Sequence, residues 1–518
     1  MVSHRPGVAA SLSVMALCPE VRGRFGRYNT SARGAGEQTA NRARPPPRYI
    51  GPVSHDQHGL AMSGASTAAA RHYDRAIDEL LHLRVEVAAE TKAALADSPG
   101  FPMGNVLSAY LGLLTTEADD ARKARARFGA FRRVVDEASL LPRERTHVAA
   151  VQALLDGDFL RCGTLLAWIT VEHPRDALAL LAGHQIDFFT GDARSLRDRI
   201  GGALNAWRHD DRHFGHVLGM YAFGLEEAGH YDRSEEVGLR AVELNPRDVW
   251  GIHAVAHTYE MQGRFGHGLR YLDARLPDWS TGTFFNVHTW WHYCLYALES
   301  GDVARALAIY DAVLAGGQSS MELLDAAALL WRLHLEGSEQ HERWRALADA
   351  WPPRVAEPFY AFNDMHAVMA YVGAGRIGDA EQLIMEREAY VLEPRPGVTN
   401  HNMTLQVGLP VCRAIVAYGR GDHASVVELL YPIRHRVNEF GGSHAQRDAV
   451  QKTLLEAALR AGLRDVARAL VSERINVRPC SPYNWLKQAA LADQLGERAA
   501  ATAARLRADD LARTGGRP

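Results

Sequence analysis

Two short segments in the middle of the chain carry histidines at a spacing that suits metal binding. His253, His257 and Glu260 follow one another at i, i+4 and i+7. His288 and His292 repeat the i, i+4 step further along the chain. On an α-helix residues at these spacings lie on one stripe, so their imidazole nitrogens and the carboxylate point to one place. First-row divalent metals accept such nitrogen and oxygen ligands, so we take these five residues as candidate metal ligands.

A second group of polar residues is expected to line the same region. Asp364 and His366 occur in the run FNDMHAVMAYVGAGR, where His366 holds the position within its repeat that His292 holds in an earlier one. His444, Arg447 and Asp448 occur in the run GGSHAQRDAV. These five residues are candidates for binding a ligand, and no catalytic role is assigned to any of them.

Each of these patterns has a plainer interpretation. Histidines of repeat helices are often buried and hydrogen bonded to a backbone carbonyl or to a tyrosine such as Tyr259. Ser443, His444 and Asp448 could suggest a hydrolytic triad, but Ser443 with Gln446 three residues later is typical of a helix capping box. The metal-protease pattern H-E-x-x-H and the phosphate-binding pattern G-x-x-x-x-G-K are both absent from the sequence. The sequence leaves open whether the protein is an enzyme.

The elements that must position these residues are marked by a recurring glycine. It occurs, usually followed by a polar residue, at Gly157, Gly191, Gly229, Gly263, Gly301, Gly375, Gly421 and Gly462. The intervals between them are 34, 38, 34, 38, 74, 46 and 41 residues. A period of 34 residues is typical of the tetratricopeptide repeat, a pair of antiparallel helices. The 74-residue interval has room for an unmarked pair near residues 323–336.

We therefore predict an all-α fold, a tetratricopeptide-like solenoid over residues 66–518 that forms a right-handed superhelix without a sheet. Such a solenoid presents the first helix of each pair to a concave groove. The sequence thus predicts a groove that carries the histidines, glutamate and aspartates and that binds a partner protein, a peptide or a small polar ligand. The alternative is a metal-dependent or acid–base enzyme that uses the same histidine cluster, with a first-row divalent metal as its cofactor.

Residues 1–65 have a different composition from the rest. They are rich in arginine, glycine, proline and serine and show no apolar periodicity, which predicts a disordered arm. An arginine-rich organellar presequence is one interpretation of the arm, and a start codon assigned too early is the other. The second interpretation makes Met62 the first residue of the protein.

Whole-chain composition narrows the partners. The chain has 58 basic and 61 acidic residues, and no run of eighteen residues is apolar enough to span a membrane. From the near balance of charge we expect no nucleic-acid partner and no membrane partner. Five cysteines lie far apart with no C-x-x-C pair, which favours a reducing, cytoplasmic location. The sequence does not predict the oligomeric state.

The chain also resembles the tetratricopeptide repeat protein 38 family. The resemblance is carried by HFGHVLGMYAFGLEEAGHYDRSEEVGLRAVELNPRDVWGIHAVAHTYEMQGR, VHTWWHYCLYALESGD, FNDMHAVMAYVGAGR and GGSHAQRD, and it covers about residues 70 to 510. It implies a helical-repeat fold found in bacteria and animals, and it implies no particular reaction.

Overall fold

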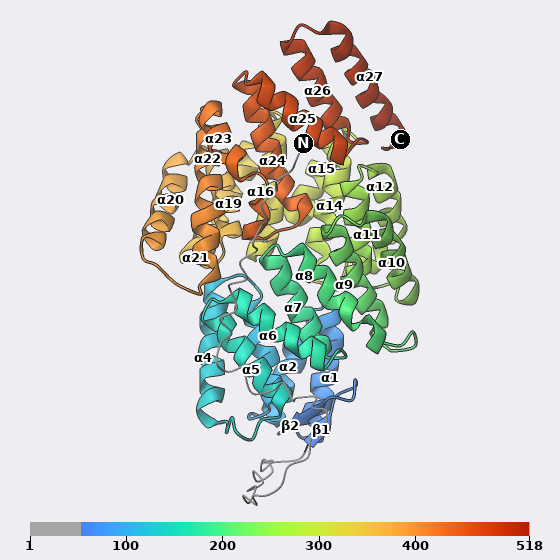
Figure 1. Ribbon diagram of the computed structural model, residues 1–518, viewed down its shortest axis with the longest axis vertical. Helices are drawn as coiled ribbons and strands as arrows, with labels where there is room; N and C mark the ends of the chain where they lie inside the picture. Colours follow the sequence, from blue (N-terminus) through green and yellow to red (C-terminus); the bar gives the residue numbers. More distant parts are fainter. Residues whose placement is uncertain (1–52, 517–518) are drawn as a thin grey trace, which may run out of the picture. The chain divides into compact units, whose positions relative to one another are not determined.

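The computed structural model describes residues 53–516, which belong to one compact unit spanning 48–518. Within this range the chain is almost entirely helical (Figure 1). The only strands of the described residues precede residue 66, so the predicted all-α, tetratricopeptide-like solenoid is confirmed for 66–516.

The elements are as follows, with η marking short 3₁₀ or π turns. The first half contains β1 (Val53–His55), β2 (Ala61–Ser63), α1 (Thr67–Leu81), α2 (Val87–Asp97), α3 (Pro102–Leu113), α4 (Ala118–Val134), α5 (Pro142–Leu155), α6 (Phe159–Glu172), α7 (Ala177–Phe189), α8 (Ala193–Ala203), η2 (Leu204–Ala206), α9 (Phe214–Glu227), α10 (Tyr231–Leu244), α11 (Val249–Met261) and α12 (Phe265–Ala274). The second half contains α13 (Leu276–Trp279), α14 (Asn286–Glu299), α15 (Val303–Ile309), η3 (Tyr310–Leu314), α16 (Ser320–Leu335), α17 (His341–Ala350), α18 (Pro352–Val355), α19 (Ala361–Gly373), α20 (Ile377–Leu392), α21 (Thr399–Met403), η4 (Thr404–Gly408), α22 (Leu409–Gly419), α23 (His423–Leu430), η5 (Tyr431–Ile433), η6 (Val437–Phe440), α24 (His444–Arg460), α25 (Arg464–Val477), α26 (Pro482–Gln494) and α27 (Arg498–Thr514).

The recurring glycines lie in the turns between paired helices, as the sequence predicts. Each of the eight has a positive φ, between 65° and 80°, in the left-handed region that a residue without a Cβ adopts readily. The aspartate that follows the glycine in four of these turns caps the next helix. Asp158, Asp192, Asp302 and Asp422 each cap the next helix by accepting a hydrogen bond from a backbone N–H of its first turn. A Gly-Asp pair therefore ends one helix and begins the next.

Four pairs carry weaker or no sequence markers. Gly337 and Gly496 occupy the same left-handed turn position in α16/α17 and α26/α27. The first of these is the unmarked pair expected near residues 323–336. In α1/α2 and α3/α4 the left-handed residues are Leu83 and Thr116, with φ of 54° and 61°. The glycine pattern could not reveal these two pairs, because neither contains a turn glycine.

The solenoid folds back on itself through α24. This helix contacts α11, α16, α22 and α23, so it lies across the inner faces of several first helices. The Trp331 indole N–H on α16 donates to the Thr453 hydroxyl on α24 at 2.8 Å, and the His444 backbone N–H donates to Glu227 at 2.7 Å. Before α24, Gly441 and Gly442 approach Tyr360 and Phe362 too closely for any side chain. The inner face near α11 and α14 is thus covered by the chain itself.

This packing differs from the open concave groove that we expected. In a shallow solenoid the first helices face solvent, whereas here α24 occupies that side of α11 and α16. All residues of α11 are buried, chiefly by α9, α10, α12 and α14, and α24 adds to this cover. The physical reason is the packing of α24, in which nearly every residue from Ala445 to Leu459 is buried, several polar ones included, because the helix contacts α11, α16, α22, α23 and α25.

The predicted arm of residues 1–65 lies mostly outside the described residues. Its described end, from residue 53, forms an antiparallel hairpin in which Val53 pairs with Ser63 and His55 with Ala61. The hairpin packs on the solenoid, because Ser63 donates to Glu144 of α5 through both its backbone N–H and its hydroxyl. Met62, the proposed alternative start, is fully buried in β2.

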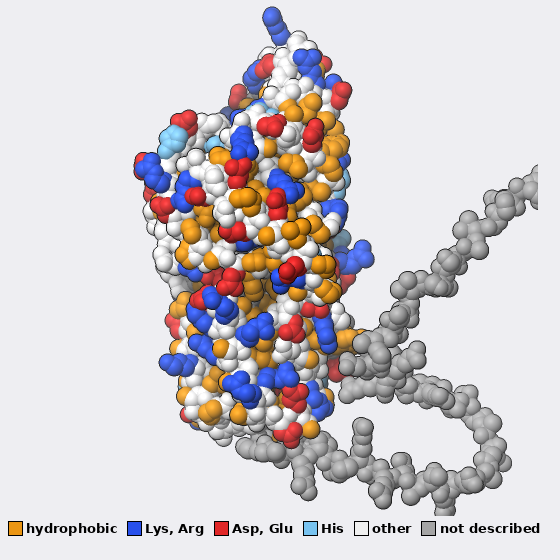
Figure 2. All heavy atoms as spheres, turned by 90° about the vertical axis from the view of Figure 1, so that its left-hand side faces the viewer, with side chains coloured by type: hydrophobic (Ala, Val, Ile, Leu, Met, Phe, Trp, Pro, Cys, Tyr) orange, Lys and Arg blue, Asp and Glu red, His pale blue; other side chains and the backbone are white. Residues whose placement is uncertain are grey.

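The face drawn in Figure 2 shows no concentration of one charge. Figure 2 shows basic and acidic side chains interspersed there, with hydrophobic side chains between them. None of the helices in residues 53–516 combines the length and hydropathy needed to cross a lipid bilayer.

Candidate metal centre

The histidine pairs lie on α11 and α14, the first helices of two successive repeats. Asp248 begins α11 by accepting a hydrogen bond from the Gly251 backbone N–H at 3.2 Å. Small residues allow the helices around α11 to approach closely: a Cβ on Gly219 of α9 would lie 2.7 Å from the Gly251 nitrogen. The next helix, α14, packs against both α11 and α12. The repeat therefore places two i, i+4 histidine pairs on neighbouring helices.

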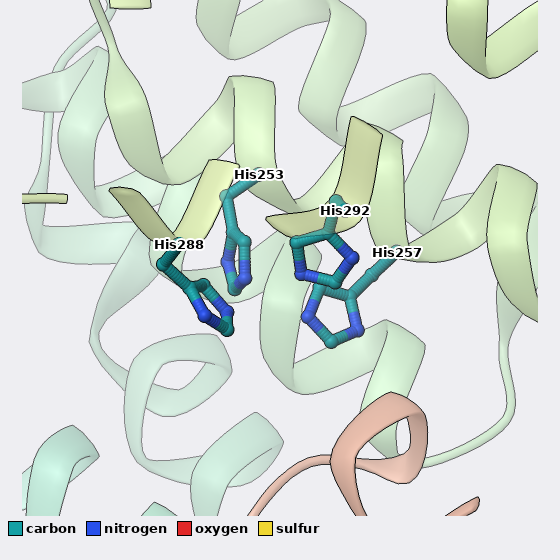
Figure 3. Close-up of side chains that lie close together, drawn as sticks. All are labelled: His253, His257, His288 and His292. Atoms are coloured by element: carbon teal, nitrogen blue, oxygen red, sulfur yellow. The ribbon is translucent and has the colours of Figure 1, made fainter. Parts of the chain in front are cut away.

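The four imidazoles of His253, His257, His288 and His292 converge on one point. Each can offer one nitrogen such that all four nitrogens lie within 4.8 Å of one another. The ring centroids of His257 and His292, and those of His253 and His257, are 4.3 Å apart. Figure 3 shows the four rings pointing into a common space from two helices. The convergence expected from the helical spacing is present.

Most ring nitrogens of this cluster have no hydrogen-bond partner within residues 53–516. Both nitrogens of His253, both of His257 and Nε2 of His292 are buried and lack a hydrogen bond to any residue between 53 and 516. His257 and His292 are fully buried. Buried polar atoms are normally hydrogen bonded, because an unpaired one costs about 1–3 kcal/mol. Five such atoms in one place indicate a ligand for imidazole nitrogen.

Carboxylates lie behind three of the four rings. Nδ1 of His288 is 2.8 Å from Asp325 on α16, and Nδ1 of His292 is 2.9 Å from Glu260 on α11. Nδ1 of His257 is 3.5 Å from Glu226 on α9. A carboxylate that accepts the Nδ1 proton fixes the ring and leaves Nε2 with its lone pair facing the other way, the usual arrangement around metal-bound histidine. Glu260, expected to be a metal ligand, contacts the His292 ring.

The surroundings of His253, His257 and His292 favour the neutral imidazole. Burial, followed by the neighbouring imidazoles, lowers the pKa values of His253, His257 and His292 well below the usual range. Burial also raises the pKa of Glu260 to about 7, although Arg478 and Arg332 oppose this effect. Neutral imidazole is the form that binds a metal, so these three rings need no deprotonation at pH 7.

A smaller acidic group adjoins the histidines on the α9 side. Glu226, Glu227 and His257 can also bring one ligand atom each within 4.8 Å of one another. Arg447 donates to Glu227 at 3.0 Å, whereas both carboxylate oxygens of Glu226 are buried without a hydrogen-bond partner among the described residues. Burial and the charge of Glu227 raise the pKa of Glu226.

The remaining residues expected at the site are divided between two places. His444, Arg447 and Asp448 lie near the cluster, and Nδ1 of His444 is 3.8 Å from Glu226. Asp448 is ion paired with Arg474 at 2.8 Å, and although burial opposes it, Arg474 and Arg478 lower the pKa of Asp448. The capping interpretation of Ser443 holds, because its hydroxyl accepts from the Gln446 N–H at 3.2 Å.

Asp364 and His366 belong to other interactions. Both oxygens of Asp364 accept from the buried Arg387 guanidinium, at 2.9 and 3.0 Å. Nδ1 of His366 is 2.8 Å from the Phe362 carbonyl oxygen, one turn earlier in α19. The structure does not bring these two residues into the histidine cluster.

Sequence reasoning missed Asp325 and Glu226. Asp325 lies in α16, in the helix pair whose turn glycine, Gly337, is not among the eight repeat markers, so the repeat pattern gave no register for it. Glu226 could have been found, since it precedes Gly229 by three residues, as Glu260 precedes Gly263.

The donor set fits a first-row divalent metal. Four imidazoles supply nitrogen ligands, the described cysteines are buried free thiols, and none of them belongs to the cluster. Nitrogen-rich sites of this kind suit zinc, copper, nickel, cobalt or iron, and exclude the oxygen-seeking calcium and magnesium.

Comparison with known proteins bears on the fold alone. No protein-family model matches the chain. Human IFIT1, solved as a dimer with PPP-AAAA, is 14% identical over 89% of this chain and 96% of its own, with a TM-score of 0.39. The APC/C hetero-tetramer Cut9–Hcn1 (11% identical, 87% and 96% covered, TM-score 0.32) and yeast Tom70 (10% identical, 86% and 95% covered, TM-score 0.30) also match. These are tetratricopeptide-like helical-repeat proteins.

One expectation about partners is corrected by these matches. We excluded nucleic acid because basic and acidic residues nearly balance over the chain. That exclusion is wrong, because IFIT1 structures with PPP-AAAA and Gppp-AAAA are among the similar helical-repeat proteins. Net charge averages over the whole surface and does not describe any one part of it.

Proposed function

We propose that this chain is a metal-binding helical-repeat protein in which His253, His257, His288 and His292 hold one divalent first-row transition metal. The observation that carries the proposal is the convergence of four buried imidazoles, five of whose nitrogens have no hydrogen bond to any of residues 53–516. A core built for packing alone would fill this space with apolar side chains.

The carboxylates strengthen the proposal. Asp325, Glu260 and Glu226 each lie at the Nδ1 side of a different ring. This arrangement leaves Nε2 as the ligand atom of three histidines. The three carboxylates come from three different helices, α16, α11 and α9.

The other sequence-based expectations have less support than the metal centre. Membership of the tetratricopeptide repeat protein 38 family and a cytoplasmic location remain proposals, supported by the helical-repeat fold and by the free thiols of the described cysteines. A peptide-binding groove has less support than the metal centre, because α24 covers α11 and α16. A metal-dependent reaction remains the alternative, and it requires a ligand-binding space next to the centre.

The test is the metal content of the purified full-length chain, measured by inductively coupled plasma mass spectrometry after expression in metal-supplemented medium. We expect about one zinc, copper, nickel, cobalt or iron ion per chain, and cobalt loading should give visible ligand-field absorption. His257→Ala should lose the metal while its circular dichroism stays helical.

His366→Ala is the matched control, because His366 is equally buried but lies outside the cluster. It should retain the metal. A wild-type protein without metal after loading, or equal metal content in the two variants, would show that the histidines are core residues.

A further inference from the structure

A cavity with several charged residues in its wall lies beside the histidine cluster. It has a volume of about 650 Å³ and is formed by the first turns of α24, the last turns of α25 and the segment around residues 434–438. Met261, the last residue of α11, forms part of its wall. Cavities of roughly 300–1,000 Å³ accommodate small molecules.

The wall of this cavity carries an excess of positive charge. Four arginines line it, Arg434, Arg447, Arg474 and Arg478, against two acidic residues. The acidic residues are Asp448 and Glu473. Glu227 does not line the cavity, but it pairs with Arg447. With Glu227 included, four guanidinium groups face three carboxylates.

The ion pairs in the wall are shared rather than matched one to one. Asp448 lies 2.8 Å from the Arg474 guanidinium and 3.6 Å from that of Arg478, so two cations face one carboxylate. Arg478 also lies against the Met261 sulfur, a weak acceptor. Arg434 is 3.6 Å from Glu473, a distance without a close hydrogen bond.

Two nitrogen atoms of residues in the same wall make no hydrogen bond within the described chain. Nε of Arg434 and Nδ1 of His444 are buried and lack a hydrogen bond to any residue of the described chain. A guanidinium N–H can only donate, so Arg434 needs an oxygen from outside the protein or loses a hydrogen bond. Both atoms belong to residues that line the cavity.

We infer that this cavity binds a small anion that carries phosphate or carboxylate groups. Guanidinium groups bind such oxyanions by charge-assisted and often bidentate hydrogen bonds. The alternative is that the arginines serve only as salt bridges between α24 and α25. That explains Arg474, which is 2.8 Å from Asp448, but the nearest carboxylates to Arg434 and Arg478 are 3.6 Å away.

The position of the cavity links the anion to the proposed metal centre, and in this respect the inference rests on the proposed function. His444 lines the cavity, and its Nδ1 is 3.8 Å from Glu226. Glu226 in turn is 3.5 Å from Nδ1 of His257. Two side chains thus separate a bound anion from a metal-binding ring. The anion site would supply the substrate or regulatory ligand of a metal-dependent protein.

The experiment is isothermal titration of the full-length chain, stripped of metal, with inorganic phosphate and separately with succinate. We expect at least one of them to bind, and the tighter one identifies the phosphate or carboxylate class. Arg478→Gln and Arg434→Gln should each raise Kd roughly tenfold, the effect of losing one charge-assisted hydrogen bond. Two variants are used so that the result does not depend on either one folding.

Arg468→Gln is the matched control. Arg468 lies on the same helix as Arg474 but is exposed and paired with Asp465, outside the cavity. Its Kd should equal that of the wild type. Failure of both anions to bind, or equal weakening by Arg468→Gln, would overturn the inference.

His292→Ala separates the two proposals. This variant should lose metal, measured on the same preparation, and still bind the anion with wild-type Kd. A metal-free wild type that binds the anion would refute the metal centre alone, and a metal-loaded wild type that binds neither anion would refute the cavity alone.

Discussion

Buried imidazoles must find a partner for each nitrogen, and in this chain the partners of one nitrogen are carboxylates. Asp325 and Glu260 lie within 2.9 Å of Nδ1 of His288 and His292, and Glu226 lies 3.5 Å from Nδ1 of His257 without a hydrogen bond. The Nε2 atoms of His257 and His292 have no hydrogen-bond partner among the described residues. A carboxylate of this kind acts on the metal through the ring that it orients. It should therefore affect metal affinity without touching the ion.

Asp325→Asn tests this relation. The amide keeps the shape of the side chain but removes the charge that favours the Nδ1–H tautomer of His288. We expect metal affinity to fall roughly 10- to 100-fold, measured by competition with a chromophoric chelator. Asp302→Asn is the control. Residue 302 caps α15 and lies outside the cluster, and asparagine caps a helix as well as aspartate does. Unchanged affinity in Asp325→Asn would show that His288 is not a ligand.

Histidines outside the cluster make stability depend on pH. Burial lowers the pKa of His366 to about 4 from a usual value of about 6.5. The unfolded chain therefore binds a proton that the folded chain excludes as pH falls from 6.5 towards 4. The contribution, about 3 kcal/mol at its fullest, is present above pH 6.5 and is lost across this window.

We expect the unfolding free energy from urea titrations to fall steadily between pH 6.5 and pH 4. His366→Gln removes the titrating group, so its stability should fall less over the same range, even if the variant is less stable at pH 8. Parallel curves for the two proteins would contradict the assignment.

Among the elements, the turn between paired helices is the most regular feature of the chain. Its glycine takes a left-handed conformation, and in four turns an aspartate then caps the next helix. The sequence predicts the fold because this requirement is local and only glycine meets it without strain. It misses α1/α2 and α3/α4 because Leu83 and Thr116 take the same conformation there at a cost in strain.

Gly337→Ala tests the conformational requirement without steric interference. A Cβ at Gly337 would meet nothing within 4 Å, but its φ is 81°. We expect a loss of about 1 kcal/mol in urea unfolding, from backbone strain alone. Gly378→Ala, which also has open space but lies in the first turn of α20, should instead gain roughly 0.5 kcal/mol. The same sign for both changes would refute this explanation of the turn.

At the scale of the whole molecule, α24 determines what the repeats can do. It lies against α11 and α16 and covers the face on which the sequence predicts an open groove. Helical spacing is a property of one helix, so the i, i+4 pattern could predict the convergence of the histidines. The return of α24 depends on contacts between residues more than a hundred positions apart, such as Trp331 with Thr453, and the repeat pattern has no information about them.

Gly441→Ala should loosen this return. A Cβ there would overlap the Tyr360 hydroxyl and lie 2.5 Å from the Phe189 carbonyl oxygen, and φ is 86°. We expect hydrogen exchange to become faster in α24 and also in α11 and α16, which are distant in sequence. Gly462→Ala, with a similar φ and open space, is the control and should affect only its own turn. Changes confined to residues near 441 would show that α24 is not needed to protect the inner helices.

The covering of the inner face by α24 also bears on how such a chain can change in evolution. Open solenoids gain and lose repeats freely, because each repeat contacts only its neighbours. Here the insertion of one helix pair between α11 and α24 would move Trp331 away from Thr453 and Glu227 away from His444. The number of repeats in this stretch is therefore fixed by geometry, and relatives of the chain should vary in their loops and ends while keeping the same count of helix pairs between the histidines and α24.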